Sequence, residues 1–430
     1  MEFREQLINE WVEIIRSQYI PQTRHAFILK APPSFGKCRT AMIMASELVH
    51  SRPIKAIILT RLIKSAKITW TEQLNKWFSG MFSFAFISCA ALARSSQNLH
   101  KAAQTAGWDS ADQADVLIFD EYHNITEVIA ARLWSVKCCA LLLSATATKE
   151  KDRLACSTWP IHTFLECSIQ DTRRAGLTPE VKIIKVYLPQ PQQVTWQVRP
   201  SKKAVCPPVT YGDYMRYYQY QKNSSFYISG TLNDYAAFCS IQKDYLMQHL
   251  KDTGPGKWKA ALAPMMNLKR MLSATKVNYL IHHAPQLRWL ANRCLIFTMT
   301  ISEARILSQY GYGQCIHSKQ NAKINEAYFH QFNTHQINSL ISVNMLSEMV
   351  NLKDLRTSLF IQCDKSPIRG MQKFGRLLRS TGSTIYVFVY ENMAHDEKYF
   401  KTFLSNLDLT VKDVIETNVG QLCQTTQSIT

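Results

Sequence analysis

One short segment has the residue types that a phosphate-binding loop needs. It comprises residues 31–38 (APPSFGKC), after an apolar run and before a stretch with helical spacing. Such a loop needs small residues, so that backbone N–H groups can wrap phosphates, and a lysine that reaches the terminal phosphates beside a helix N-terminus. Gly36 and Lys37 meet these needs. We therefore predict a nucleotide-phosphate site made by Ser34, Gly36, Lys37 and Cys38.

Two positions of this loop depart from the usual pattern. Ser34 stands where glycine is common, and Cys38 stands where a Ser or Thr hydroxyl would bind Mg²⁺. A thiol is a poor ligand for that hard ion. Because a helix N-terminus and a neighbouring lysine both lower the pKa of a thiol, we expect Cys38 to be more reactive than a buried structural cysteine. The alternative is that Cys38 is a small buried filler.

An acidic pair follows another apolar run. Residues 115–123 read DVLIFDEYH, with Asp120 and Glu121 at the end of a predicted strand. In a parallel sheet the carboxyl ends of the strands border the ligand crevice. Asp120 could hold Mg²⁺ there, while Glu121 orients and deprotonates water. The alternative, a solvated turn, is weakened by the phosphate loop upstream. A further strand, residues 141–146 (LLLSAT), ends in hydroxyl residues.

The elements that must position these residues are short, continuously apolar runs that alternate with helical stretches, as buried parallel strands do. In the N-terminal part we predict strands at 26–31, 55–60, 82–88, 115–120 and 140–144, with helices at 40–49 and 70–78. In the C-terminal part we predict strands at 294–300, 314–317, 339–343, 359–363 and 385–390, with helices at 302–310 and 323–332. This alternation is typical of an α/β fold with two doubly wound parallel-sheet lobes.

We predict four regions along the chain. They are lobe one (1–150), a linking helical and irregular segment (151–265), lobe two (266–405) and a C-terminal tail (406–430). Prolines at 189, 191, 200, 207 and 208 argue against regular structure in the linking segment. A tyrosine-rich stretch follows, and the helical spacing of Tyr214, Tyr217 and Tyr218 predicts one packed face. The alternative is that bases stack on these rings.

Composition narrows the partners. The chain has 50 Lys and Arg against 32 Asp and Glu, a formal charge of +18. This surplus favours a polyanionic partner such as nucleic acid, although a merely basic protein would show it too. The 12 cysteines include no CxxC pair, so we expect neither a zinc site nor a disulfide framework. No apolar run reaches the roughly 20 residues of a membrane span, so we expect a non-membrane, cytoplasmic protein.

The order of these motifs resembles that of superfamily 2 helicases of the DExH type. Residues 120–123 (DEYH) look like their motif II and 144–146 (SAT) like motif III, with 60–61 in the place of motif Ia. In lobe two the similar segments are 293–298 (RCLIFT, motif IV), 342–351 (SVNMLSEMVN, motif V) and 371–379 (MQKFGRLLR, motif VI). Met349 replaces the usual glycine of motif V. The resemblance covers residues 1–150 and 265–400, and it implies that both lobes are RecA-like.

The resemblance also implies roles for individual residues. ATP and Mg²⁺ would be the cofactors, with Lys37 on the terminal phosphates, Asp120 on the metal and Glu121 as general base. Arg376 and Arg379 would act as arginine fingers from lobe two. Gln372 and His123 would couple the nucleotide to lobe closure. Residues at positions that face nucleic acid in the family, with ordinary loop structure as the alternative, are Thr60, Arg61, Ser88, Phe297, Thr298 and Asn344.

The resemblance therefore predicts an ATP hydrolase that is a DNA helicase or a DNA-remodelling translocase, acting in replication, recombination or repair. Residues 68–77, 270–276 and 395–398 resemble stretches of Swi/Snf-type motors and of phage or viral helicases, which favours single-stranded, duplex or branched DNA. The alternatives are a duplex translocase without strand separation, an RNA helicase, and a degenerate non-catalytic module that binds nucleic acid. Ser34, Cys38 and Met349 favour the degenerate module. It is opposed more strongly by the retention of Lys37, Asp120, Glu121, Gln372, Arg376 and Arg379.

Overall fold

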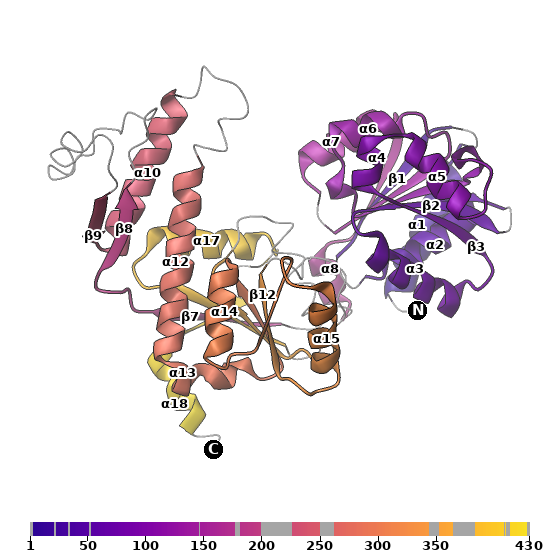
Figure 1. The fold of residues 1–430 in the computed structure, drawn as a ribbon. Coiled ribbons are helices and arrows are strands. Elements are labelled where there is room, and N and C mark those ends of the chain that lie inside the picture. Colours follow the sequence, from indigo (N-terminus) through magenta and orange to yellow (C-terminus); the bar gives the residue numbers. More distant parts are fainter. Residues whose placement is uncertain are drawn as a thin grey trace.

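Two α/β lobes make up the chain (Figure 1). The computed structural model describes residues 3–20, 23–32, 35–50, 53–145, 147–176, 181–198, 226–249, 262–343, 352–363, 383–407, 409 and 413–427. The predicted fold class is confirmed, because each lobe is built on a parallel sheet with helices on both faces. None of the described helices is both long enough and apolar enough to cross a bilayer.

The first lobe has a six-stranded sheet with the order β3-β2-β4-β5-β1-β6, and all its strands are parallel. The strands are β1 (His25–Lys30), β2 (Ile54–Thr60), β3 (Phe82–Ser88), β4 (Val116–Asp120), β5 (Cys139–Ser144) and β6 (Ile161–Glu166). One face is covered by α1 (Phe3–Gln18), α2 (Lys37–Leu48) and α3 (Ile63–Trp77). The other face carries α4 (Cys89–Arg94), α5 (Gln97–Thr105), α6 (Glu127–Leu133) and α7 (Lys149–Thr158).

The strands of this sheet form because their side chains are apolar on both faces. Every residue of β4 and β5 is buried. Successive side chains of a strand point to opposite faces, so Val116 and Ile118 pack towards α1–α3 while Leu117 and Phe119 pack towards α4–α7. By the same alternation Asp120 belongs to the α1–α3 face. The order of the strands also brings the carboxyl ends of β4, β5 and β1 next to one another.

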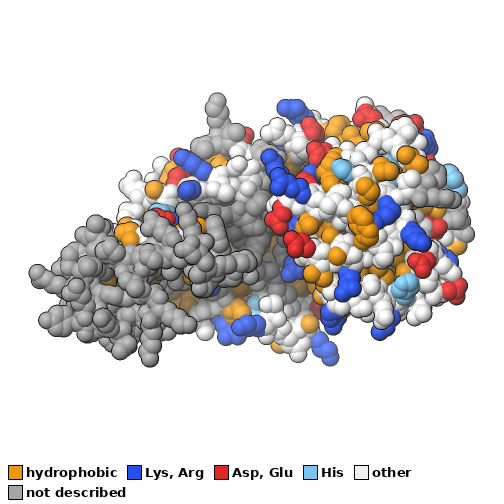
Figure 2. All heavy atoms as spheres, turned by 90° about the horizontal axis from the view of Figure 1, so that it is seen from above, with side chains coloured by type: hydrophobic (Ala, Val, Ile, Leu, Met, Phe, Trp, Pro, Cys, Tyr) orange, Lys and Arg blue, Asp and Glu red, His pale blue; other side chains and the backbone are white. Residues whose placement is uncertain are grey.

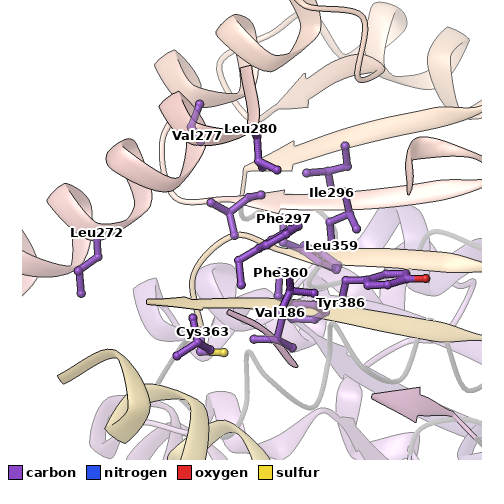
Figure 3. Close-up of a cluster of buried hydrophobic side chains, with 14 of the residues drawn as sticks. Val186, Leu272, Val277, Leu280, Ile296, Phe297, Leu359, Phe360, Cys363 and Tyr386 are labelled. Atoms are coloured by element: carbon purple, nitrogen blue, oxygen red, sulfur yellow. The ribbon is translucent and has the colours of Figure 1, made fainter. Parts of the chain in front are cut away.

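The second lobe has a seven-stranded parallel sheet, ordered β11-β12-β10-β13-β14-β7-β15. Its strands are β7 (Lys182–Leu188), β10 (Cys294–Thr298), β11 (Gln314–His317), β12 (Ser339–Val343), β13 (Thr357–Phe360), β14 (Thr384–Tyr390) and β15 (Val414–Asn418). The main helices are α12 (Ala263–His282), α14 (Ile301–Gln309), α15 (Ala322–Asn333), α17 (Ala394–Ser405) and α18 (Val419–Gln427). One apolar cluster joins both faces of this sheet (Figure 3).

Strands from the linking segment and from the tail extend both sheets. β6 forms an edge of the first sheet, β7 lies inside the second sheet, and β15 forms its edge. Neither β6 nor β7 has the continuously apolar sequence on which the strand predictions rested. Five of the six residues in β6 are not buried, and β7 carries two lysines among its apolar residues. A helix of this segment, α8 (Ile169–Arg174), lies between β6 and β7 in the chain.

The rest of the linking segment contains a two-stranded antiparallel ribbon and a long helix. The ribbon consists of β8 (Val194–Val198) and β9 (Phe226–Gly230), and α10 (Leu232–His249) follows it. Trp196 of the ribbon packs against Tyr235 of α10, with ring centroids 5.0 Å apart. The tyrosine-rich stretch lies outside the described residues. Burial of Trp196 therefore explains regular structure in a region where the prolines predict little of it.

Candidate nucleotide-binding site

The phosphate loop connects β1 to the first turn of α2. Its backbone is tied to the neighbouring strand, because Ala31 N donates to Ser144 O at 3.1 Å. Gly36 has φ 91°, a left-handed conformation that favours glycine, and α2 begins at the next residue. The ammonium of Lys37 lies 3.4 Å from Ala31 O, on the inside of the loop. The loop thus presents a helix N-terminus and a lysine at the carboxyl edge of the sheet, which is the arrangement that binds phosphate.

Helix α1 braces this loop, a contact that the sequence motifs do not reveal. Trp11 packs against Phe35 of the loop with ring centroids 5.3 Å apart, and both side chains are buried. Arg39, in the first turn of α2, donates to both carboxylate oxygens of Glu5, at 2.5 and 3.1 Å. An aromatic contact and a bidentate ion pair therefore fix the start of α2 to the N-terminal helix.

Asp120 ends β4 below the surface of the site, with 6% of its area exposed. Burial, together with the charge of Glu121, raises the pKa of its carboxyl from 3.8 to about 6. Lys37, His123 and the indole of Trp70, whose Nε1 donates to Oδ2 at 3.1 Å, oppose that rise. A pKa near 6 leaves the group ionised at neutral pH. A hard divalent cation would offset the cost of this buried charge, so the donor fits Mg²⁺.

Trp70 is a functional neighbour that the motif pattern missed. It lies in α3, is fully buried, and packs edge-on against Phe84. An indole N–H can only donate, so a buried Trp beside a carboxylate fixes the orientation of that carboxylate. In the sequence Trp70 lies within residues 68–77, on the apolar side of a predicted helix, where it also fits an ordinary core residue.

Glu121 lies next to Asp120 and contacts His123. Its Oε2 lies 3.1 Å from His123 Nδ1, which also lies 3.2 Å from the hydroxyl of Ser144. The amide of Asn124 lies 3.4 Å from His123 Nε2. A proton on Nδ1 lets the imidazole donate to the Glu121 carboxylate. The buried imidazole therefore connects the acidic pair to the end of β5.

The thiol of Cys38 lies in the first turn of α2, partly buried against the apolar cluster under α1 and α2. Burial raises its pKa well above the usual value, and Asp120 adds to this rise while Lys37 opposes it. The prediction of an unusually reactive thiol has the wrong direction. Loss of solvation of the thiolate, together with a buried carboxylate, outweighs the helix N-terminus and the lysine.

Three of the five described residues that were predicted to face nucleic acid have buried side chains. Phe297 is 2% exposed and packs against Phe360, with ring centroids 4.8 Å apart, so its ring lies in the core of the second lobe (Figure 3). The hydroxyls of Thr60 and Thr298 are also buried, because both residues end central strands. Ser88 caps α4 by accepting from Ala91 N at 3.1 Å. Arg61 is exposed, and its role stays a prediction.

The remaining predicted site residues lie outside the described residues, and their roles stay predictions. They are Ser34 in the phosphate loop, Asn344 in the segment like motif V, and Gln372, Arg376 and Arg379 in the segment like motif VI. Among the described candidates, the structure brings together Gly36, Lys37, Cys38, Asp120, Glu121 and His123 at one edge of the first sheet.

Comparisons with known proteins agree with this picture. Residues 275–381 match the family model for the helicase conserved C-terminal domain. No curated protein matches the sequence significantly. A structure of S. cerevisiae Dbp5 bound to RNA and ADP BeF3 is similar over 99% of this chain and 93% of that chain, with 10% identity and a TM-score of 0.56. The Pyrococcus furiosus Hef helicase domain aligns over 93% of this chain and 99% of that chain, with 14% identity and a TM-score of 0.47.

The structural likeness and the family match concern different properties of the chain. The likeness to Dbp5 concerns the fold of tandem RecA-like lobes, and the family match concerns residues of the second lobe. The two findings show the fold of the chain and a similarity of residues 275–381 to the helicase conserved C-terminal domain.

Proposed function

We propose that the chain is an ATP-dependent DNA helicase or DNA-remodelling translocase of the DExH type. The observation that carries this proposal is the clustering of Lys37, Asp120, Glu121 and His123 at the carboxyl edge of the first sheet. Asp120 responds electrostatically to Lys37, Glu121 and His123, so these groups share one site. A phosphate-binding lysine beside two carboxylates, one of them buried and ionised at neutral pH, is suited to hydrolysis of a nucleoside triphosphate.

Each side chain has a role that follows from its position. Lys37 and the N-terminus of α2 bind the terminal phosphates, and Asp120 holds Mg²⁺, which when bound neutralises charge on the phosphates. Glu121 accepts the proton of the attacking water. His123 keeps the Glu121 carboxylate in place through Nδ1–H. Arg376 and Arg379 act from the second lobe, as the resemblance of residues 371–379 to motif VI implies.

The basic charge of the chain supports a nucleic-acid track. On the face shown in Figure 2, Lys and Arg side chains of the first lobe are scattered among acidic ones, without forming one stripe. Scattered basic residues can contact the phosphates of a nucleic acid at several separate points. Such contacts do not depend on base sequence, as expected of a motor that moves along nucleic acid. DNA is favoured by the resemblance of residues 68–77, 270–276 and 395–398 to Swi/Snf-type and phage helicases. RNA is the second candidate, because the similar Dbp5 structure is bound to RNA.

The test is the ATPase rate with no nucleic acid, single-stranded DNA, duplex DNA, forked DNA and RNA. We expect DNA to stimulate turnover, with little dependence on base sequence and a steep loss of binding as salt rises. Stimulation by RNA alone would overturn the DNA assignment and support the second candidate. Nucleic-acid binding without ATPase activity under any condition would support the degenerate binding module.

Point variants test the chemistry. Glu121→Gln keeps the shape but cannot act as a base, so turnover should fall by about 10²- to 10⁴-fold while ATP still binds. Glu127→Gln, an exposed glutamate in α6, is the matched control and should leave the rate unchanged. Arg376→Ala and Arg379→Ala should each lower stimulated turnover by on the order of 10³-fold. Near-normal rates in Glu121→Gln would remove that residue from the role of base.

A further inference from the structure

The candidate general base has an unusual backbone conformation. Glu121 has φ 62° and ψ 57°, the left-handed region that residues with a Cβ rarely adopt. Such a conformation persists only when the surrounding structure determines it, and it is common at functional sites. The residues on either side of Glu121 must therefore be held firmly, on both faces of the sheet.

On one side Asp120 is held on the face of the sheet that carries α1–α3. It is the last residue of β4, its backbone is paired with Leu143 of β5, and the indole of Trp70 donates to its Oδ2. The backbone on the N-terminal side of Glu121 is therefore fixed by the end of β4. This anchor belongs to the site already described.

On the other side Tyr122 is held on the opposite face. Its ring is fully buried in the cluster under α4–α7, and its hydroxyl donates to Asp152 Oδ1 at 2.7 Å. Asp152 lies in the first turn of α7, and 19% of its side chain is exposed. Its second oxygen, Oδ2, accepts from Lys30 Nζ at 2.8 Å. Both oxygens of this carboxylate are thus used, each by a different part of the lobe.

The three segments that meet at Asp152 are the ones that carry the chemistry. Lys30 is the last residue of β1, immediately before the phosphate loop. Tyr122 follows the acidic pair, and α7 follows the segment that begins at Ser144. We infer that Asp152 is a positioning residue, which fixes Tyr122 and thereby holds the Glu121 carboxylate against the phosphate loop. This inference rests on the proposed function, since it assigns how the proposed base is oriented.

The sharpest test is Tyr122→Phe, which removes one hydroxyl and keeps the ring in the core. A misplaced base slows the chemical step without weakening the phosphate contacts. We therefore expect kcat of the nucleic-acid-stimulated ATPase to fall by about 10- to 100-fold, with KM for ATP and the Kd for ADP changed less than about twofold. Asp152→Ala should give the same loss. Asp152→Asn should keep most of the rate, since its amide oxygen can still accept from Tyr122.

The matched control is Glu166→Gln. Glu166 also contacts Lys30, at 3.1 Å, but its side chain is 59% exposed, and the hydroxyl of Tyr122 donates to Asp152 instead. Its kcat should stay at the wild-type value. A double variant, Tyr122→Phe with Asp152→Ala, should lose no more than either single variant, because both remove the same hydrogen bond.

Two results would overturn the inference. One is a normal kcat in Tyr122→Phe with the thermal unfolding temperature of the wild type. The other is an equal loss of kcat in Glu166→Gln, which would make Lys30 rather than the tyrosine bond the cause. Failure of the proposed function is distinguishable, because the wild type would then show no nucleic-acid-stimulated ATPase activity, or Glu121→Gln would retain it. An inactive Glu121→Gln beside a fully active Tyr122→Phe would refute only the positioning role.

Discussion

A buried ion pair in the second lobe allows a quantitative prediction. Lys276 of α12 is fully buried, and its ammonium lies 2.7 Å from Asp396 Oδ2, 2.9 Å from Gln362 Oε1 and 2.7 Å from Phe388 O. The three donors of the ammonium therefore each have an acceptor. Asp396 also accepts from Gln362 Nε2 at 3.0 Å and from Tyr390 N at 2.8 Å. The group joins α12, α17 and the chain that follows β13.

Lys276→Met removes the cation and keeps most of the volume. Asp396 would then be a buried carboxylate with two neutral donors and no counter-charge. Breaking a buried pair in this way costs about 3 to 5 kcal/mol of stability, because the remaining charge is not compensated. Lys276→Met combined with Asp396→Asn should be more stable than Lys276→Met alone, since the second change removes that charge.

Lys185→Met, in β7 of the same lobe, is the matched control. Lys185 is also buried, but its partners Glu397 and Glu416 have side chains that are 30% and 45% exposed. After the substitution both carboxylates can return to water, so the loss should be about 1 kcal/mol or less. The contrast between the two lysines isolates burial of the partner as the cause.

Hydrogen exchange measured by mass spectrometry suits a chain with two lobes, for which a single unfolding transition is not assured. Amides of β14 should exchange roughly 100-fold faster or more in Lys276→Met, the equivalent of about 3 kcal/mol. Amides of β4, in the other lobe, should be unchanged and serve as the internal reference. Equal exchange of β14 in wild type, Lys276→Met and Lys185→Met would refute the reasoning.

Two further predictions concern the first lobe. Because burial raises the pKa of Cys38, iodoacetamide should modify this thiol slowly at pH 8 in the nucleotide-free protein, as mass spectrometry would measure. Cys38→Ser should keep ATPase activity. Rapid modification of Cys38 would contradict burial of the thiol. The pKa of Asp120 is about 6 in the folded protein, against 3.8 for an exposed carboxyl. The folded state therefore binds the carboxyl proton more tightly than the unfolded state does. Ionisation of Asp120 thus lowers the stability of the fold above pH 6 and has no such effect below pH 4. Asp120→Asn should therefore stabilise the metal-free protein by up to about 3 kcal/mol at pH 8 and by less at pH 5, as thermal unfolding in a chelator would measure; a larger effect at pH 5 would contradict the sign.

The sequence by itself determined most strands of the two sheets, though not β6, β7 and β15, and the position of the candidate site at the carboxyl edge of the first sheet. The runs that became β4 and β5 are apolar up to their last residue, because strands buried on both faces have no solvent-facing side for polar residues. Residues that follow such strands must lie at the carboxyl edge of a parallel sheet. That rule was enough to place the phosphate loop and the acidic pair at one edge, before any contact was known.

Only the tertiary structure decided which distant residues share an environment. Asp152 and Tyr122 are 30 positions apart, Trp70 and Asp120 are 50 apart, and Lys276 and Asp396 are 120 apart. The order of strands in a sheet differs from their order in the chain, so such pairs leave no local pattern.

Packing likewise decided whether the pKa of a side chain is raised or lowered and whether the side chain faces the core or the solvent. Cys38 has a raised pKa because it is buried beside a carboxylate, and Phe297 faces the core because β10 is a central strand. β7 was not predicted because it contains the buried Lys185. The carboxylates that pair with this lysine lie on α17 and β15, more than 200 residues further along the chain. Desolvation and ion pairing depend on what three-dimensional packing places around a group, and neighbouring letters in the sequence do not contain that information.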